Sequence, residues 1–223
     1  MPDSIVKAIF FLFLLGWVGT QSLYAVPANE AINASLKSLE STEELDQIRP
    51  LFDIKERYQT GYTTLYNRYQ MTQEEYRKVE EKFEAAGIPL FFALIPYSES
   101  KFQPNAHGYG TAGLWQLTKQ SARNFGLTVQ KKRDERLNAG RSTDAIIRLL
   151  LSLKKEFGTW YLADFAYASG EGTLRRLIEK NKTTKLSVLL KDPHFPSGAK
   201  SQFAKTLLLD AKIHYTKEDP SHD

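Results

Sequence analysis

Residues 87–117 read GIPLFFALIPYSESKFQPNAHGYGTAGLWQL, an apolar half followed by a glycine-rich half. Five side chains of the apolar half are spaced four, three, four and three residues apart: Ile88, Phe92, Ile95, Glu99 and Phe102. On a helix this spacing places all five side chains on one face. The pattern predicts a helix over residues 88–102 with a bend at Pro96, because proline removes one intrahelical hydrogen bond.

Glu99 is the one ionisable group of this apolar stripe. Aliphatic and aromatic neighbours take hydration away from a charged carboxylate, which raises its pKa and keeps it a proton donor near neutral pH. A general acid needs such a group. The alternative is a carboxylate at the helix end that pairs with Lys101 or another base, and periodicity alone does not decide between the two.

The glycine-rich half predicts a change of structure. Residues 103–113 contain three glycines and a proline, so they cannot continue a helix, and we expect an ordered loop here.

Helical patterns cover most of the chain. Leucine and isoleucine between acidic positions predict one or two short helices over residues 29–48, ended by Pro50, and a further helix over 51–69. Thr72 and Glu75 have the spacing of a capping box, which predicts the start of a helix that stops near Gly87, and Pro89 can start the next one. Later helices are expected over 114–125, 142–157 with Ser142 or Thr143 as N-cap, 160–168, 171–180 and 200–214. With few strands visible, the fold class is expected to be mainly α.

Composition limits the protein class. A chain of 223 residues is long enough for one domain or one and a half. Its 42% hydrophobic and 25% charged residues are near the averages of globular proteins, which excludes disordered, collagen-like and multi-span membrane proteins. The absence of cysteine excludes disulfides, thiolate zinc sites and a cysteine nucleophile. Because 30 basic residues are offset by 26 acidic ones, we expect no nucleic-acid partner.

The N-terminal segment resembles a secretory signal. Residues 8–19, AIFFLFLLGWVG, form a 12-residue apolar run behind Lys7, and small residues such as Ala25 follow it. A membrane-spanning helix needs about 20 apolar residues. We therefore expect a signal peptide over residues 1–25, export to the periplasm or cell envelope, and no stable membrane span after cleavage. An uncleaved N-terminal anchor is the alternative.

Three segments in fixed order suggest a family: Glu99-Ser100, Gly113-Leu114-Trp115-Gln116, and Ala166-Tyr167-Ala168-Ser169-Gly170. Together they resemble the signature segments of lytic transglycosylases with the goose-lysozyme-like fold. The lead-in at 87–90 and the late helix at 203–213 are similar to the branch of membrane-bound lytic murein transglycosylase D, here without LysM repeats. The resemblance implies a lysozyme-like helical domain over 87–215, with an N-terminal helical extension over 26–86 and a flexible tail over 216–223.

The activity implied by this resemblance is cleavage of the β-1,4 bond between N-acetylmuramic acid and N-acetylglucosamine in peptidoglycan glycan strands. By its match to the family's acid, Glu99 would protonate the glycosidic oxygen and then accept the proton of the muramic acid 6-hydroxyl as that oxygen attacks C1. The product is a 1,6-anhydro sugar. Such a reaction needs no second carboxylate, so no catalytic part is expected for the other acidic residues considered, Asp134, Asp144, Asp164 and Glu171.

The resemblance also implies substrate-binding residues. Ser100 and Tyr167 match positions whose hydroxyls bond near the sugar, and Gln116 matches an amide that can bond to an acetamido group. The alternatives are a serine hydroxyl satisfied by backbone, a surface glutamine and a core tyrosine. No cofactor or metal is expected, because the four histidines, His107, His194, His214 and His222, have no paired spacing.

Two departures from the family pattern concern the expected cleft. Ala168 stands where the family usually has asparagine, and Gly108 stands where a sugar-contacting serine is common, in a loop about one residue shorter than usual. A non-catalytic peptidoglycan-binding or scaffold protein therefore stays an alternative, as does a hydrolytic muramidase with a second carboxylate across the bond.

Overall fold

The computed structural model describes residues 27–52 and 59–216. The expected signal peptide at 1–25 lies outside this part, as do residues 217–223 of the expected tail. In the described ranges no helix is both long and apolar enough to span a membrane.

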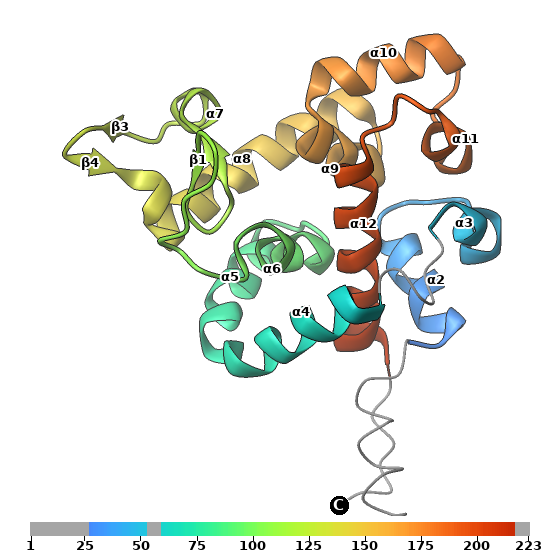
Figure 1. Ribbon diagram of the computed structural model, residues 1–223, viewed down its shortest axis with the longest axis horizontal. Helices are drawn as coiled ribbons and strands as arrows, with labels where there is room; N and C mark the ends of the chain where they lie inside the picture. Colours follow the sequence, from blue (N-terminus) through green and yellow to red (C-terminus); the bar gives the residue numbers. More distant parts are fainter. Residues whose placement is uncertain (1–26, 53–58, 217–223) are drawn as a thin grey trace, which may run out of the picture.

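The chain is mainly α-helical, as the periodicity predicts (Figure 1). The α-helices are α2 Asn29–Ser38, α3 Leu45–Phe52, α4 Gln59–Met71, α5 Gln73–Ala85, α6 Ile95–Ser100, α7 Lys119–Asn124, α8 Ala139–Phe157, α9 Trp160–Ser169, α10 Glu171–Asn181, α11 Leu186–Lys191 and α12 Ser197–Asp210. The described residues also form two 3-10 helices, η1 Leu90–Leu94 and η2 Glu135–Leu137, and a π-helix, η3 Ala211–Tyr215. Two antiparallel hairpins pair β1 Thr111–Ala112 with β2 Leu117–Thr118, and β3 Val129–Gln130 with β4 Arg133–Asp134.

Helix α12 forms the centre of the fold (Figure 1). It packs against α2, α4, α6 and α9. Phe203 of α12 contacts Phe91 of η1 and Phe165 of α9, with ring centroids 5.7 and 5.1 Å apart. This aromatic packing joins the segment that carries Glu99 to the segment that carries Tyr167.

The N-terminal helix α2 is fixed to the C-terminal end by a buried polar cluster. The hydroxyl of Ser35 donates to Asp210 Oδ2 at 2.5 Å, and Asp210 Oδ1 lies 2.7 Å from His214 Nδ1. His214 Nε2 lies 3.1 Å from the hydroxyl of Tyr76 on α5. Among the described residues, the first and last helical segments are therefore part of one packed body.

The prediction of one continuous helix over 88–102 was wrong. Residues 90–94 form the 3-10 helix η1, which Pro89 precedes, and an α-helix begins only at Ile95. Pro96 lies in the first turn of α6, where a backbone N–H has no intrahelical partner, so it starts the helix and does not bend it.

Two N-cap predictions also need correction. Thr72 is the N-cap of α5, but its hydroxyl donates to the carbonyl of Arg68 and bonds to Tyr97, so no capping box forms. Helix α8 begins at Ala139, because Asn138 accepts a hydrogen bond from the backbone N–H of Arg141.

Other differences lie at segment ends. Pro50 lies inside α3, which continues to Phe52 while Leu45 and Ile48 are buried. The helix expected over 114–125 is limited to α7, because Gly113 and Gln116 adopt positive φ angles that turn the chain into the β1–β2 hairpin. Of the helix expected over 51–69, residues 53–58 lie outside the described part, and the remainder falls in α3 and α4. Helix α11 was not predicted.

Candidate functional site

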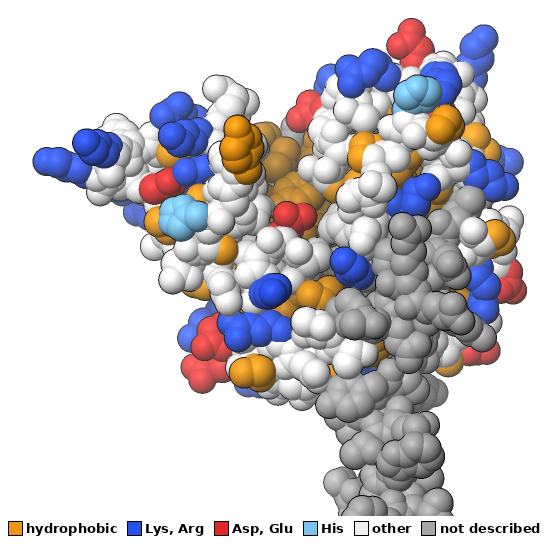
Figure 2. Space-filling model, in the orientation of Figure 1, with side chains coloured by type: hydrophobic (Ala, Val, Ile, Leu, Met, Phe, Trp, Pro, Cys, Tyr) orange, Lys and Arg blue, Asp and Glu red, His pale blue; other side chains and the backbone are white. Residues whose placement is uncertain are grey.

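A cavity of about 340 Å³ collects residues from all three signature segments. It opens between the lobe that carries α7 and the hairpins and the lobe that carries α10, where Figure 2 shows a hollow with an acidic side chain and apolar side chains at its floor. Its lining consists of Glu99, Trp115, Gln116, Leu117, Thr118, Ser121, Leu149, Leu153, Ala166, Tyr167, Ala168, Gly170 and Glu171.

Glu99 points its half-buried carboxyl into this cavity. Burial raises the pKa of the Glu99 carboxyl above its usual value. Within the described residues no hydrogen bond or ion pair reaches the carboxylate, and Lys101, the base named in the ion-pair alternative, is exposed. The described part of the fold therefore contains no ion pair for Glu99.

The end of α6 places Glu99 at the cavity wall. Lys101 and Phe102 adopt left-handed φ angles of 54° and 58°, so the chain leaves the helix directly after Ser100. The hydroxyl of Ser100 donates to the carbonyl of Leu114 at 2.8 Å and accepts from the backbone N–H of Gln103 at 3.2 Å. Ser100 is buried, does not line the cavity, and ties the first signature segment to the second.

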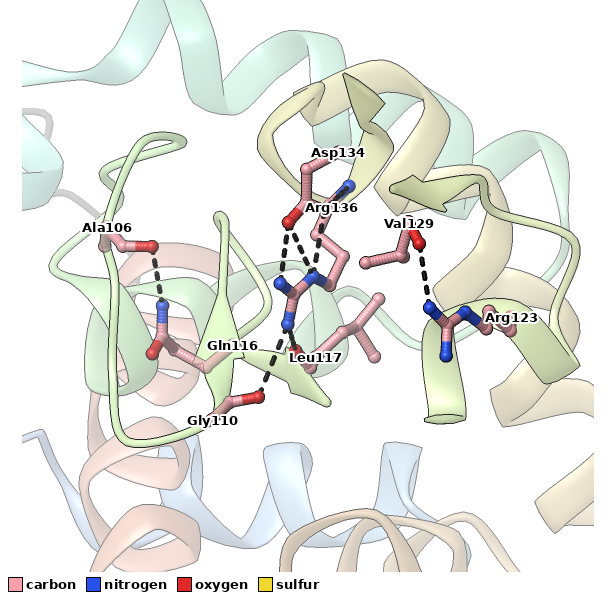
Figure 3. Close-up of polar contacts among 8 residues, drawn as sticks. All are labelled: Ala106, Gly110, Gln116, Leu117, Arg123, Val129, Asp134 and Arg136. Atoms are coloured by element: carbon pink, nitrogen blue, oxygen red, sulfur yellow. Dashed lines mark hydrogen bonds and ion pairs between the residues drawn. The ribbon is translucent and has the colours of Figure 1, made fainter. Parts of the chain in front are cut away.

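Gln116 lines the cavity, but the loop before it occupies its amide. The Nε2 group donates to the carbonyl of Ala106 at 3.4 Å (Figure 3) and to that of Gly113 at 2.8 Å. The Oε1 atom accepts from the hydroxyl of Thr111. Gln116 therefore fixes the loop that forms one wall of the cavity.

Arg136 also holds this loop, through hydrogen bonds to its backbone. The sequence did not identify Arg136 as a residue of the site. Its buried guanidinium forms an ion pair with Asp134 at 2.6 Å and donates to the carbonyls of Leu117 and Gly110 (Figure 3). The Arg136 hydrogen bond holds the pKa of Asp134 below its usual value. The signal available in the sequence is weak, because Asp134 and Arg136 are only two residues apart in a charged stretch.

Tyr167 bridges two of the signature segments. Its hydroxyl donates to the carbonyl of Trp115 at 2.9 Å, and its side chain lines the cavity with Glu99. Burial, together with the nearby charge of Glu99, raises the pKa of Tyr167 well above its usual value. The phenol therefore stays neutral and can act as a hydrogen-bonding group in the cavity.

The departures at Gly108 and Ala168 have structural consequences. A Cβ atom on Gly108 would lie 2.3 Å from Thr111 Oγ1 and 2.5 Å from Gln116 Oε1. A serine at this position would therefore require the side chains of Thr111 and Gln116, which are hydrogen-bonded to each other, to move. Ala168 lines the cavity, where it offers a methyl group and no polar contact.

Two further carboxyls, of Asp164 and Glu171, lie near Glu99 or in the cavity lining. Asp164 lies on α9, one turn before Tyr167, and is fully buried; burial raises its pKa to about 7, with Gln202 acting against the shift and Glu99 adding to it. Glu171 lines the cavity and lies 3.1 Å from Arg175. Across the described ranges no group of three or more acidic or histidine side chains is arranged to hold a metal ion.

Part of this chain is similar to known proteins. Residues 80–189 match the family described as "Transglycosylase SLT domain". The chain is 33% identical over 132 residues to membrane-bound lytic murein transglycosylase D of Escherichia coli (strain K12). The matched region covers 58% of this chain and 29% of that protein. The chain is 38% identical over 112 residues to a putative tributyltin chloride resistance protein of Alteromonas sp. (strain M-1), covering 48% of this chain and 54% of that protein. The chain thus spans about half or less of the length of these relatives.

Proposed function

We propose that this chain, whose residues 80–189 form an SLT-type transglycosylase domain, is a peptidoglycan lytic transglycosylase that leaves 1,6-anhydro-N-acetylmuramic acid ends. The observation that carries the proposal is the Glu99 carboxyl, which lines the cavity without a charged partner among the described residues. The cavity unites it with residues of the second and third signature segments.

In the proposed reaction Glu99 performs both proton transfers. Its raised pKa keeps a proton available for the glycosidic oxygen, whose departure leaves an oxocarbenium-like centre at C1. The Glu99 carboxylate then accepts the proton of the muramic acid 6-hydroxyl while that oxygen bonds to C1. The half-buried apolar setting suits both steps, because it favours the neutral acid before the reaction and makes the carboxylate basic after it.

The proposed roles of the other site residues follow from their contacts. Tyr167 faces the cavity beside Glu99, so its hydroxyl oxygen is available to bond to the acid or to the sugar. Gln116 is proposed to contact the substrate from the cavity wall while its amide holds the loop. Ser100 stays a prediction as a sugar ligand, and its hydrogen bonds favour a role in shaping the turn.

A hydrolytic muramidase is the second candidate, and Glu171 is the observation that favours it. An enzyme that adds water needs a second carboxylate in the same cleft, and Glu171 lines the cavity that contains Glu99. Against this role, Arg175 lies 3.1 Å from the Glu171 carboxylate and a second ion pair joins Arg175 to Glu156. We therefore favour the internal 6-hydroxyl as the nucleophile.

We further propose that the protein is exported and acts in the periplasm or cell envelope. The apolar run at 8–19 behind Lys7 supports export. The relative from E. coli carries "membrane-bound" and "murein" in its name, which is consistent with a substrate in the envelope.

Mass analysis of purified peptidoglycan after incubation with the protein tests the proposal. Anhydro ends support the transglycosylase, and new reducing ends indicate the hydrolase. Glycan strands that stay intact but co-sediment with the protein indicate a non-catalytic binding module.

A further inference from the structure

Behind the cavity, α9 and α12 meet through one buried polar pair, Asp164 and Gln202. Asp164 is 0% exposed and Gln202 is 7% exposed. Gln202 Nε2 donates to Asp164 Oδ1 at 3.2 Å. The other oxygen of each group, Asp164 Oδ2 and Gln202 Oε1, is buried and has no hydrogen-bond partner among the residues that the structure describes.

The two unpartnered atoms are both acceptors if Asp164 is ionised. A carboxylate oxygen and an amide oxygen can only accept hydrogen bonds, so neither can donate to the other. Each buried oxygen has then lost its hydrogen bonds to water without a replacement, which destabilises the fold. A single proton on Asp164 Oδ2 makes that oxygen a donor toward Gln202 Oε1. In an acid–amide pair of this kind the two groups would share two parallel hydrogen bonds, and both buried oxygens would gain partners.

The charges around Asp164 favour the same state. The carboxyl has no ion pair in the described part of the chain, and the charged group that acts on it is Glu99 of α6, which is itself acidic. Tyr167 of its own helix is a neutral phenol. The buried side chains of the neighbouring helices carry no charge: those of α10 are Leu174 and Leu177, and those of α8 are aliphatic apart from Ser142 and Thr143. The charged pair Glu40 and Lys154 contacts α9 at its first residue, Trp160.

We propose that Asp164 carries a proton while the protein works, and that its acid–amide pair with Gln202 makes it a positioning residue for Tyr167. The second half of this statement rests on the proposed function. Asp164 lies one helical turn before Tyr167, whose hydroxyl reaches the carbonyl of Trp115 in the cavity wall. Anchoring α9 to α12 at this point fixes where that hydroxyl lies, and a neutral Asp164 leaves Glu99 to titrate without a second anion behind it.

Infrared spectroscopy tests the proton without any activity measurement. In the Glu99→Gln background, we expect the carbonyl stretching band of a buried carboxylic acid at about pH 5.5, where ordinary aspartates are ionised. Adding Asp164→Asn removes the band, whereas adding Asp144→Asn, a matched change at a partly exposed carboxyl that pairs with Lys82, leaves it in place. Absence of the band in the Glu99→Gln protein, or its persistence after Asp164→Asn, overturns the proposal.

Kinetics test the positioning role. An asparagine amide can both accept from and donate to Gln202, as the protonated acid does in the proposal. For Asp164→Asn we therefore expect turnover within about threefold of the parent and an unmoved alkaline limb of the pH–rate profile. A fall of that limb by about one pH unit or more would mean that Asp164 is an anion that raises the pKa of Glu99, which overturns the proposal.

Asp164→Leu and, at the other partner, Gln202→Leu leave the remaining polar group unpaired and should lower turnover at least about tenfold, with little change in KM. Either change combined with Tyr167→Phe should be no slower than Tyr167→Phe alone, because both act through the same hydroxyl. Additive losses contradict positioning. A parent protein that does not cleave glycan overturns the proposed function, while the infrared result still decides whether Asp164 holds the proton.

Discussion

The hydroxyl of Tyr167 donates a 2.9 Å hydrogen bond to the backbone carbonyl of Trp115, a residue 52 positions earlier in the chain. This bond joins α9 to the turn before β2 across the wall of the cavity. The oxygen of the phenol keeps lone pairs that can accept from protonated Glu99 or from a bound sugar. One group therefore serves both the shape of the site and its chemistry.

Removing this hydroxyl should slow the reaction. Tyr167→Phe is expected to lower turnover ten- to a thousandfold, on the order of 1.4 to 4 kcal/mol for one lost transition-state hydrogen bond. Tyr161→Phe is the matched control, because the Tyr161 hydroxyl donates to Thr184 and does not line the cavity. An unchanged rate in Tyr167→Phe, or an equal loss in Tyr161→Phe, would contradict the role given to Tyr167.

The raised pKa of Glu99 has a consequence for stability. The folded protein holds this proton more tightly than the unfolded chain, in which a glutamate has a pKa of about 4.3. Ionisation of Glu99 therefore costs stability as pH rises above about 4.3 and through the folded-state pKa. Glu99→Gln should raise the melting temperature near neutral pH, and the gain should shrink toward about pH 4.

Melting temperatures of the parent and of Glu99→Gln, measured from about pH 4 to neutral pH, test this expectation. Glu171→Gln is the control, because this carboxyl lines the same cavity but is paired with Arg175, so its removal should not raise the melting temperature. If Glu99→Gln melts below the parent at neutral pH, a partner stabilises the ionised form and the account of Glu99 is wrong.

Gly113 allows the second signature segment to pack closely on η2. Its φ angle is 84°, and an added Cβ would lie 1.8 Å from the carbonyl oxygen of Arg136. Gly113→Ala should therefore destabilise the fold by more than about 2 kcal/mol in denaturant unfolding. Gly198→Ala is the control, since it lies in α12 with nothing within 4 Å of its Cβ position, and it should be neutral or stabilising. Equal stability of Gly113→Ala and the parent would rule out this close approach.

The polar cluster around His214, which joins α2 and α5 to the end of α12, predicts a stability that depends on pH. Burial alone would lower the pKa of His214, but the hydrogen bond and charge of Asp210, with those of Glu80, raise it above the usual value. A raised histidine pKa gives stability that is fully present below about pH 6.5 and is lost as pH rises through the folded-state pKa.

His214→Gln should therefore lower the melting temperature more at about pH 6 than at about pH 9. Ser35→Ala serves as the comparison, because it removes a hydrogen bond to the same Asp210 without removing a group that titrates in this range. A loss for His214→Gln that is the same at both pH values would mean that its charge does not stabilise the fold.

The helical fold class and the apolar setting of Glu99 follow from short-range patterns. Spacing of three and four residues identifies the buried face of the segment, even though the segment divides into η1 and α6. Patterns of this kind report which side chains are buried, and they are insensitive to whether the backbone is 3-10 or α.

The remaining features depend on contacts between distant segments. Asp164 has its partner 38 residues away on α12, and Ser100 bonds to a carbonyl 14 residues ahead. The tight space at Gly108 exists only because Thr111 and Gln116 fold back over it. No local spacing encodes such contacts, so their partners had to come from the structure.

The most direct test of the central claim compares the parent with Glu99→Gln on purified peptidoglycan, with mass analysis of the released fragments. The account predicts 1,6-anhydro ends from the parent and none from the variant, while the variant melts at or above the parent near neutral pH. Anhydro ends formed by Glu99→Gln at the parent's rate, or reducing ends in place of anhydro ends from the parent, would contradict it.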